Sequence, residues 1–414
     1  MSNSAYPYAP LSVIKSSGRY SLIGGPFGSK LGRKDYVDEG VPVVRGANLP
    51  DTERFSEQSW VYVSEKKADE LRANLAFPGD IVVTQRGTIG QVGLIPADSP
   101  VPRYVLSQSQ MKLTVDSELA DPRYVYYALA SPDAVQRLKD LSFSAGVPHI
   151  NLGMFASFEI PVPPLPIQVA IADSLSAYDE LIENNTRRIK ILEEMAQSIY
   201  KEWFVNFRYP GHENVPLVDS ELGPIPEGWR ASNLGEVSLN FDRLRKPLSK
   251  MKRAELQGPY PYYGAARVFD FLEDYIFDGT YLLVAEDGSV MTSSGTPVLQ
   301  YVTGKFWANN HTHILQGDVV STEFLYMALR EFPIQGYVTG AAQPKINQAN
   351  LNRIPVLAAS QAVQRAFDDT VKALLTLVQV LRAQNANLRA TRDLLLPRLV
   401  SGEIDVAALD FPGE

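Results

Sequence analysis

The sequence contains no cysteine and no long apolar run. Without cysteine, the chain can form neither a disulfide scaffold nor a thiolate metal site, which is compatible with a reducing compartment. No stretch of about 18 consecutive apolar residues occurs, and Met1–Tyr20 lacks the apolar core of a signal peptide. We therefore expect a soluble, cytoplasmic protein without a membrane span.

The sequence also lacks the excess of basic residues that is typical of nucleic-acid-binding proteins, because its formal net charge is −8. Acidic residues but no basic residue fall within positions 400–414, which we expect to form a loose C-terminal tail. The large segments before this tail are close to neutral. Any binding of phosphate groups must therefore come from local basic clusters rather than from the overall charge.

Motifs of common active sites are absent as well. Gly24–Lys30 resembles a phosphate-binding loop, but it lacks the Gly-Lys-Ser/Thr order that such a loop requires. His311 and His313 could share one face of a strand as metal ligands, but no third ligand has a suitable spacing, so we interpret them as alternating side chains on an exposed strand or loop. There is no Gly-x-Ser-x-Gly elbow and no Asn/Asp-Pro-Pro-Tyr/Phe motif of an amino-methyltransferase. The sequence predicts no catalytic residue and no metal site.

An internal repeat organises the chain. The matched segments are Asp121–Leu129 with Ser321–Leu329, Pro148–Asn151 with Pro344–Asn347, and Glu159–Val162 with Arg353–Val356. Before the last match in each half, short β-rich runs are broken by glycine and proline, and after it comes a stretch with helical periodicity. The predicted order is therefore a mostly-β domain, a helix, a second mostly-β domain and a second helix.

The first long helix is predicted from Ile167 to Phe207, because apolar residues recur there every seven positions in two rows. The rows are Ile171, Tyr178, Asn185, Leu192 and Ile199, and Leu175, Ile182, Ile189, Ala196 and Trp203. Two such rows form the a/d seam of a coiled coil. Asn185 in this seam either fixes the register of the helices or faces solvent.

The second long helix is predicted from Gln361 to Leu396, where Pro397 should end it. Its seven-residue row is Phe367, Leu374, Leu381, Leu388 and Leu395. The two helices have opposite formal charge and equivalent places in the repeat. These features favour an antiparallel pair over two separate amphipathic helices that each pack on their own domain.

The predicted fold class is α+β, with two mostly-β domains separated by two long antiparallel coiled-coil helices in a pseudo-twofold repeat. The expected segments are 1–160 for the first domain, 161–207 for the first helix, 208–355 for the second domain, 356–399 for the second helix and 400–414 for the tail.

Several loops carry side chains that are suited to nucleic acid. Arg can bond guanine bidentately, Gln or Asn can bond adenine, and Lys or Ser/Thr suits phosphates. Each loop taken alone could equally be a solvated surface. The candidates are Lys30, Arg33, Lys34, Gln85, Arg86, Thr88 and Gln108 in the first half, and Arg243, Arg245, Lys246, Lys250, Tyr262 and Tyr263 in the second.

In this order, the motifs resemble the DNA-specificity subunits of type I restriction–modification systems. The segments similar to target-recognition domains are Gly25–Ser29, Gly40–Asn48 and Gly79–Gly90 in the first half, and Tyr262–Ala265, Phe277–Tyr281, Asp287–Gly288 and Gly304–His311, of a different subtype, in the second. Ile160–Gln168 and Leu394–Asp405 resemble the entry to and exit from the family's conserved helices. The second entry, Ile354–Gln361, departs from the family pattern because it lacks the double proline.

The resemblance implies a non-catalytic protein in which each target-recognition domain reads one half of a bipartite, asymmetric double-stranded DNA target. It adds Ser29, Arg45, Asn48, Lys305, Asn309, Asn310 and His311 to the candidate DNA-binding residues. The helices would act as a spacer and dock two methyltransferase subunits, and motor-nuclease subunits would join the complex. S-adenosylmethionine, ATP and magnesium are expected in those partners only, so this chain should hold no cofactor.

Two other interpretations stay open at this point. The chain could be a fragment of a fused methyltransferase–specificity enzyme, against which the missing methyltransferase motif speaks. It could also be a structural coiled-coil adaptor whose domains bind something other than DNA. Salt-dependent DNA binding by the complex would distinguish the latter from a specificity subunit.

Overall fold

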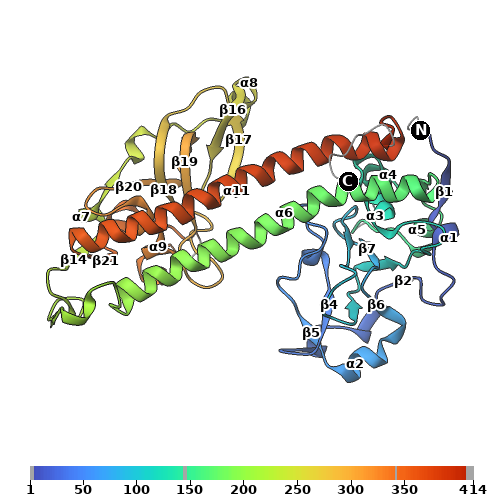
Figure 1. Cartoon of the computed structure of the whole chain (residues 1–414), viewed down its shortest axis with the longest axis horizontal. Coiled ribbons are helices and arrows are strands. Elements are labelled where there is room, and N and C mark those ends of the chain that lie inside the picture. Colours follow the sequence, from blue (N-terminus) through green and yellow to red (C-terminus); the bar gives the residue numbers. More distant parts are fainter. Residues whose placement is uncertain (1–3, 143–146, 341–342, 407–414) are drawn as a thin grey trace. The chain divides into compact units, whose positions relative to one another are not determined.

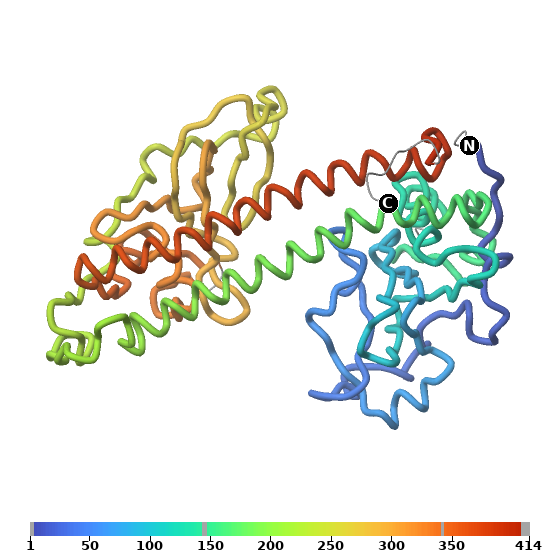
Figure 2. The backbone as a smooth tube through the Cα atoms, in the orientation of Figure 1, coloured from blue at the N-terminus to red at the C-terminus, as the bar shows by residue number. Residues whose placement is uncertain are grey.

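The computed structural model describes residues 4–142, 147–340 and 343–406. The chain divides into two compact units, of which Met1–Arg187 with Arg382–Glu414 forms the first and Arg188–Leu381 the second. Two long helices, α6 (Leu165–Tyr200) and α11 (Gln361–Ser401), contribute residues to both units (Figure 1). The chain enters the second unit through α6 and returns to the first through α11 (Figure 2).

The first unit includes a four-stranded antiparallel sheet and a five-stranded mixed sheet. The four-stranded sheet has the order β2 (Leu22–Gly24), β10 (Gln110–Leu113), β7 (Ile81–Thr84) and β8 (Val92–Leu94). The mixed sheet has the order β3 (Tyr36–Val37), β5 (Tyr62–Val63), β4 (Val41–Val44), β9 (Tyr104–Leu106) and β6 (Leu75–Ala76), with β4 parallel to β9. Most of these strands are short apolar runs with buried side chains, which explains why both sheets form part of the core.

Helices of the first unit cover the four-stranded sheet. They are α1 (Leu11–Ile14), α3 (Pro122–Ala130), α4 (Pro132–Asp140) and α5 (Leu152–Ala156), and the short helix α2 (Glu65–Glu70) lies on the mixed sheet. Asp121 caps α3 by accepting hydrogen bonds from the backbone N–H of Arg123 and Tyr124, and Pro122 occupies the first helical turn. A two-stranded pair of β1 (Tyr8–Pro10) with β11 (Glu159–Pro161) leads into α6.

The second unit is built around a six-stranded sheet. Its order is β15 (Ser238–Asn240), β20 (Thr312–Gly317), β18 (Phe277–Ala285), β19 (Leu299–Ala308), β16 (Gln257–Tyr263) and β17 (Val268–Leu272). Two-stranded pairs join β12 (Leu217–Val218) to β13 (Ile225–Pro226) and β14 (Arg230–Asn233) to β21 (Pro355–Ala358). Its shorter helices are α7 (Leu234–Val237), α8 (Lys250–Glu255), α9 (Thr322–Arg330) and α10 (Gln348–Asn352).

An aromatic cluster forms the centre of the second unit. The ring of Phe204 lies 4.7 Å from Phe324, 4.9 Å from Phe367 and 5.3 Å from Trp229, centroid to centroid. These rings come from the turn Lys201–Val205 that follows α6, from α9, from the start of α11 and from the segment before β14. The cluster therefore fixes both long helices to the domain that lies between them in sequence.

The predicted α+β repeat is confirmed. The pairs of matched elements are α3 with α9, α5 with α10, and the strand pair β1–β11 with β14–β21. In the first unit, Asp179 of α6 contacts Arg392 of α11, and Asn185 further along α6 contacts Asn385, which is earlier on α11. The two helices are therefore antiparallel there.

Asn185 lies inside the seam and not toward solvent. Its Nδ2 donates to Oδ1 of Asn385 at 3.0 Å, and both side chains are buried. Asn385 Nδ2 in turn donates to the carbonyl oxygen of Ile182 and to Oγ1 of Thr186, both at 3.2 Å. This pairing supports the interpretation that Asn185 fixes the register of the two helices, since a shift of either helix would leave these amides without partners.

The first long helix ends near the predicted Phe207, whereas the second extends beyond its predicted end. After Tyr200 the helix widens into a single π-helical turn, Lys201–Val205, and Phe207 has a positive φ of 57° that ends it. The expected stop at Pro397 was wrong, because α11 continues through it to Ser401. Leu396, Leu399 and Val400 are buried in the core of the first unit, and this burial offsets the roughly 3 kcal/mol that a proline costs inside a helix.

Candidate nucleic-acid interface

One edge of the four-stranded sheet gathers three loops of the first unit. β2 and β7 end at this edge and β10 begins there, so residues 25–31, 85–91 and 107–109 emerge side by side. Gln85 Nε2 donates to the carbonyl oxygen of Gln108 at 2.9 Å, and Gln108 Nε2 donates to those of Gly28 and Leu31 at 2.7 and 2.6 Å. These hydrogen bonds join the three loops, which we call the first loop edge.

The second unit has an equivalent edge. β15 and β18 end there and β20 begins there, so residues 241–246, 286–289 and 309–311 emerge together. Arg245 connects the three loops, since its Nη1 donates to Glu286 at 2.6 Å and to the carbonyl oxygens of Thr312 at 2.8 Å and Asn310 at 3.5 Å. We call these loops, together with the adjacent segment 343–347, the second loop edge.

The backbones of the two edges follow the same hydrogen-bond pattern. The matched N–H to carbonyl bonds are Gln85 to Ser109 (2.8 Å) with Glu286 to His311 (2.9 Å), Gly87 to Pro148 (3.0 Å) with Gly288 to Pro344 (3.1 Å), Ile150 to Gln85 (2.9 Å) with Ile346 to Glu286 (2.9 Å), and Ser107 to Val44 (2.9 Å) with Asn309 to Tyr263 (3.0 Å). Gly87 and Gly288 have φ values of 93° and 75°, which favour glycine at this turn in both loops. The two edges are thus one backbone frame carrying different side chains.

At the first loop edge, the predicted residues divide by exposure. Ser29, Lys30, Arg86, Thr88 and Gln108 are exposed, whereas Gln85 is buried and supports Gln108. Beneath them, a neutral polar network joins the strands. Its hydrogen bonds are Thr84 Oγ1 to Gln91 Oε1 (3.1 Å), Gln110 Nε2 to Thr84 Oγ1 (3.2 Å) and Ser107 Oγ to Gln110 Oε1.

Four predicted residues of the first unit have other surroundings. Asn48 is fully buried and its Nδ2 donates to the carbonyl oxygens of Ser56 and Gln58 at 3.0 Å, so it holds its own loop. Arg45 donates to the backbone of Ser59. Arg33 and Lys34 are exposed on a short 3-10 turn after the first loop of the edge.

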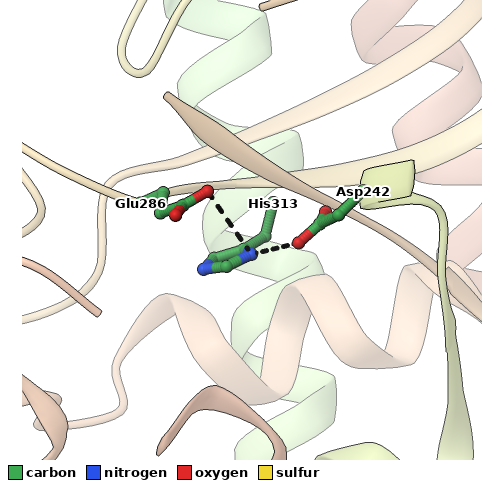
Figure 3. Close-up of side chains that lie close together, drawn as sticks. All are labelled: Asp242, Glu286 and His313. Atoms are coloured by element: carbon green, nitrogen blue, oxygen red, sulfur yellow. Dashed lines mark hydrogen bonds and ion pairs between the residues drawn. The ribbon is translucent and has the colours of Figure 1, made fainter. Parts of the chain in front are cut away.

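An ionic cluster of the buried His313 with the partly buried Asp242 and Glu286 lies beneath the second loop edge (Figure 3). His313 Nδ1 lies 2.6 Å from an Asp242 oxygen and 4.0 Å from Glu286, and its Nε2 lies 2.9 Å from the carbonyl oxygen of Ile346. Both ring nitrogens of His313 therefore lie within hydrogen-bond distance of an oxygen. His313 lies in β20 with about 1% of its surface exposed, so the expectation that it sits on an exposed strand or loop was wrong.

The cluster balances its charges with protein side chains. Asp242 Oδ2 lies 3.5 Å from Arg245, and Glu286 lies 2.6 Å from Arg245 and 3.1 Å from Lys345. Burial alone would raise the pKa of Asp242, but the hydrogen bond and charge of His313, the N–H of Ile314 and the charge of Arg245 outweigh it and lower that pKa. Asp242, Glu286 and His313 could offer three ligand atoms to a cation. Since Arg245 and Lys345 already occupy the carboxylates, we assign the cluster a structural role.

Around this cluster, predicted residues again differ in exposure. Arg243, Lys246 and Asn310 are exposed, and His311 is half exposed with its Nδ1 2.8 Å from Asp287. Asn309 is buried, and its Oδ1 accepts from the N–H of His311 at 2.9 Å. The site residues predicted from the sequence did not include Asp242, Glu286, Asp287 and Lys345. For Lys345 the repeat was the available signal, since Lys345 matches His149 in the repeated Pro-x-Ile-Asn segment.

The remaining candidates lie on the β16, β19 and α8 side of the second unit. Tyr262 is buried and its hydroxyl accepts from the N–H of Leu248 at 3.1 Å, while Tyr263 is partly buried against Phe306. Lys305 is exposed, and its Nζ lies 4.5 Å from the centre of the Tyr275 ring, a cation–π contact. Lys250 is exposed at the start of α8.

The chain is similar to specificity subunits of type I restriction enzymes. The family model described as "Type I restriction modification DNA specificity domain" matches residues 28–194 and 226–377. The chain is 24% identical over 404 residues to the type I restriction enzyme MjaIX specificity subunit of Methanocaldococcus jannaschii, covering 91% of this chain and 89% of that protein. It is 23% identical over 380 residues to the HindI specificity subunit of Haemophilus influenzae, covering 74% and 83%.

A solved structure has the same fold. The S subunit of a type I restriction–modification system from M. genitalium superposes with a TM-score of 0.59 at 19% identity, covering 96% of this chain and 97% of that one. Among the described residues, no helix is long and apolar enough to cross a membrane.

Proposed function

The chain belongs to the family of type I restriction–modification DNA specificity subunits, and from this premise we propose that its two loop edges each read one half of a bipartite, asymmetric double-stranded DNA target. As a member of this family, it is a non-catalytic component of a methyltransferase and endonuclease complex. The observation that carries the proposal is the repetition of one backbone frame with unlike side chains at its exposed edge.

The chemistry of the two edges supports an asymmetric target. The first edge exposes Lys30, Arg86, Thr88 and Gln108, which are neutral or basic. The second combines Arg243, Lys246 and Lys345 with the acidic side chain of Asp287. Since base edges are recognised by matching donors and acceptors, two edges with different donors and acceptors should select different half-sites. The exposed cationic side chains at both edges are suited to phosphate contacts that would position the two target-recognition domains on DNA.

We further propose that the long helices dock two methyltransferase subunits. Outward-facing apolar side chains occur on α6 and α11 in both units: Leu181 and Leu394 in the first, and Ile191, Met195, Leu377 and Val380 in the second. These residues lie outside the seam, so burial within the helix pair does not explain them. The presence of such residues in each unit supports the docking of one methyltransferase subunit per unit.

The proposal places the chemistry in the partners. The methyltransferase subunits would bring S-adenosylmethionine, the motor-nuclease subunits would bring ATP and magnesium, and the assembled complex would act in the cytoplasm. The purified chain should therefore show no methyl transfer to DNA with S-adenosylmethionine, and methylation should appear when the methyltransferase subunit is added.

Mapping the methylated bases in cells that carry the system tests the reading of DNA. We expect a split motif whose two halves differ. Exchanging residues 1–150 for the corresponding domain of another family member should change one half only, because the second loop edge is left intact. A change in both halves, or in neither, would contradict the proposal.

A further inference from the structure

The two matched loops carry opposite charges at the same position. Residues 85–88 read Gln-Arg-Gly-Thr, and residues 286–289 read Glu-Asp-Gly-Ser. Since the hydrogen bonds of Gln85 and Glu286, and the left-handed glycines Gly87 and Gly288, are equivalent, Arg86 and Asp287 project from the same point of the shared frame. A position with a fixed backbone and a changed charge is where a difference in base preference would arise.

Arg86 presents a donor at the first edge. Its side chain is exposed, and it makes no hydrogen bond or ion pair with the residues that the structure describes. Lys30 and Gln108 are exposed on the neighbouring loops of the same edge. A free guanidinium at such an edge matches the O6 and N7 acceptors of guanine, which it can bond bidentately in the major groove.

Asp287 presents an acceptor at the second edge. Its carboxylate is held by His311, whose Nδ1 lies 2.8 and 3.0 Å from its two oxygens, and about 22% of the side chain is exposed. Each carboxylate oxygen can accept a further hydrogen bond. Exposed Arg243, Lys246 and Lys345 lie on the adjoining segments, so phosphate contacts can offset the repulsion of a carboxylate by DNA. Among base edges, the N4 amino group of cytosine is the donor that aspartate pairs with.

We propose that Arg86 and Asp287 are corresponding specificity-determining residues, with Arg86 selecting a guanine in the first half-site and Asp287 selecting a cytosine in the second. The inference rests on the proposed function, because it requires that the two loop edges face DNA. It goes further by assigning one base class to one residue in each unit.

Mapping of methylated sites with the assembled complex tests the assignment. Asp287→Ala should relax one cytosine position of the second half-site, lowering the preference for cytosine there by roughly ten- to a hundredfold, while the first half-site stays unchanged. Arg86→Gln should relax one guanine position of the first half-site only. Asp318→Asn and Arg19→Gln are matched controls, since both residues are exposed at the opposite ends of β20 and β2, and both should leave the motif unchanged.

A second measurement does not depend on how well a variant folds. The wild-type complex is bound to DNA in which one cytosine of the second half-site at a time is replaced by 2-pyrimidinone, which lacks the N4 amino group. We expect a single position to weaken binding about tenfold or more, and the Asp287→Ala complex, where it assembles, to be insensitive at that position.

The outcomes separate this inference from the proposed function. If the wild-type motif is bipartite but both variants keep every base preference, or if no cytosine position is sensitive to the analogue, the assignment is wrong and the proposed function stands. If the wild-type complex methylates no bipartite motif, the proposed function itself fails.

Discussion

Replacing Asn185 by alanine should lower the free energy of unfolding of the first unit by more than one exposed hydrogen bond contributes. The substitution removes the donor that Asn385 Oδ1 accepts from at 3.0 Å, inside a seam where both residues are buried. A buried acceptor that loses its partner costs about 1–3 kcal/mol. The cavity left by the shorter side chain adds to this cost, so we expect a loss of about 2–4 kcal/mol in the free energy of unfolding.

The double variant distinguishes pairing from simple packing. Asn385→Ala alone should cost at least as much, because it leaves Asn185 Nδ2 without its acceptor and also removes the bonds to Ile182 and Thr186. With both residues changed, no amide is left without a partner across the seam. The double variant should therefore be more stable than the sum of the single losses predicts, by about 1–2 kcal/mol.

The assay is urea unfolding of the four proteins, followed by circular dichroism and by hydrogen exchange of the α6 amides. Exchange resolves the segment of α6 in the first unit, so unfolding of the second unit does not mask the effect. If the two losses add to within about 0.5 kcal/mol, the asparagines do not act as a pair and the argument for register fails.

Three further predictions concern the ionic cluster, the helix faces and the helix length. The pKa of Asp242 is lowered in the folded state, so the stabilisation from its carboxylate is present above the ordinary pKa near 4 and is lost as the pH falls through the lower folded pKa. The urea midpoint of the second unit should therefore drop less on acidification in Asp242→Asn than in the wild type. Equal drops in the two proteins would refute this. Leu181→Asp combined with Leu394→Asp should lower the number of methyltransferase subunits that co-purify with the chain from two to one, because the docking residues of the second unit stay intact, and should leave the circular dichroism spectrum unchanged; two co-purifying subunits would exclude Leu181 and Leu394 from docking. Inserting four residues in both helices at the boundary between the units, after 187 and after 381, adds about 6 Å to each; the spacer of the methylated motif should lengthen by about one or two base pairs, and a constant spacer in an active variant would show that the helices do not set it.

The parts of the fold that could be predicted are those that leave a local or repeated pattern in the sequence. The seven-residue rows identified both long helices, and the repeated segments around Asp121 and Ser321 identified the halves. The end of α11 could not be predicted in this way. Pro397 is a local stop signal, but burial of Leu399 and Val400 in a core built mostly from the other end of the chain overrides it.

The candidate site was predicted only in part, since exposure and pairing depend on the fold. Sequence placed Arg86 and Gln108 on loops, and the structure brings these loops to one edge. Tyr262 was chosen by residue type and Asn48 through the family resemblance, yet both are buried and hydrogen-bonded within their units. Asp287 was noted as part of a motif but not as a binding residue, because its equivalence with Arg86 becomes visible only through matched backbone hydrogen bonds, and the loops that follow the two residues differ in length.

The discontinuity of the first unit has a consequence for synthesis. Its core contains Leu396, Leu399 and Val400, and Ser401 accepts hydrogen bonds from Ala5 and Ser4 across nearly the whole sequence. The ribosome makes residues 188–381 before it makes these partners. While the second unit is synthesised, the N-terminal domain therefore exposes the apolar surface that the end of α11 later covers. A chain that is cut short before α11 would keep that surface exposed and would be a target for chaperones and proteases. The first unit can therefore complete its core only after the second unit has been translated. A chain with a complete first unit thus contains both target-recognition domains.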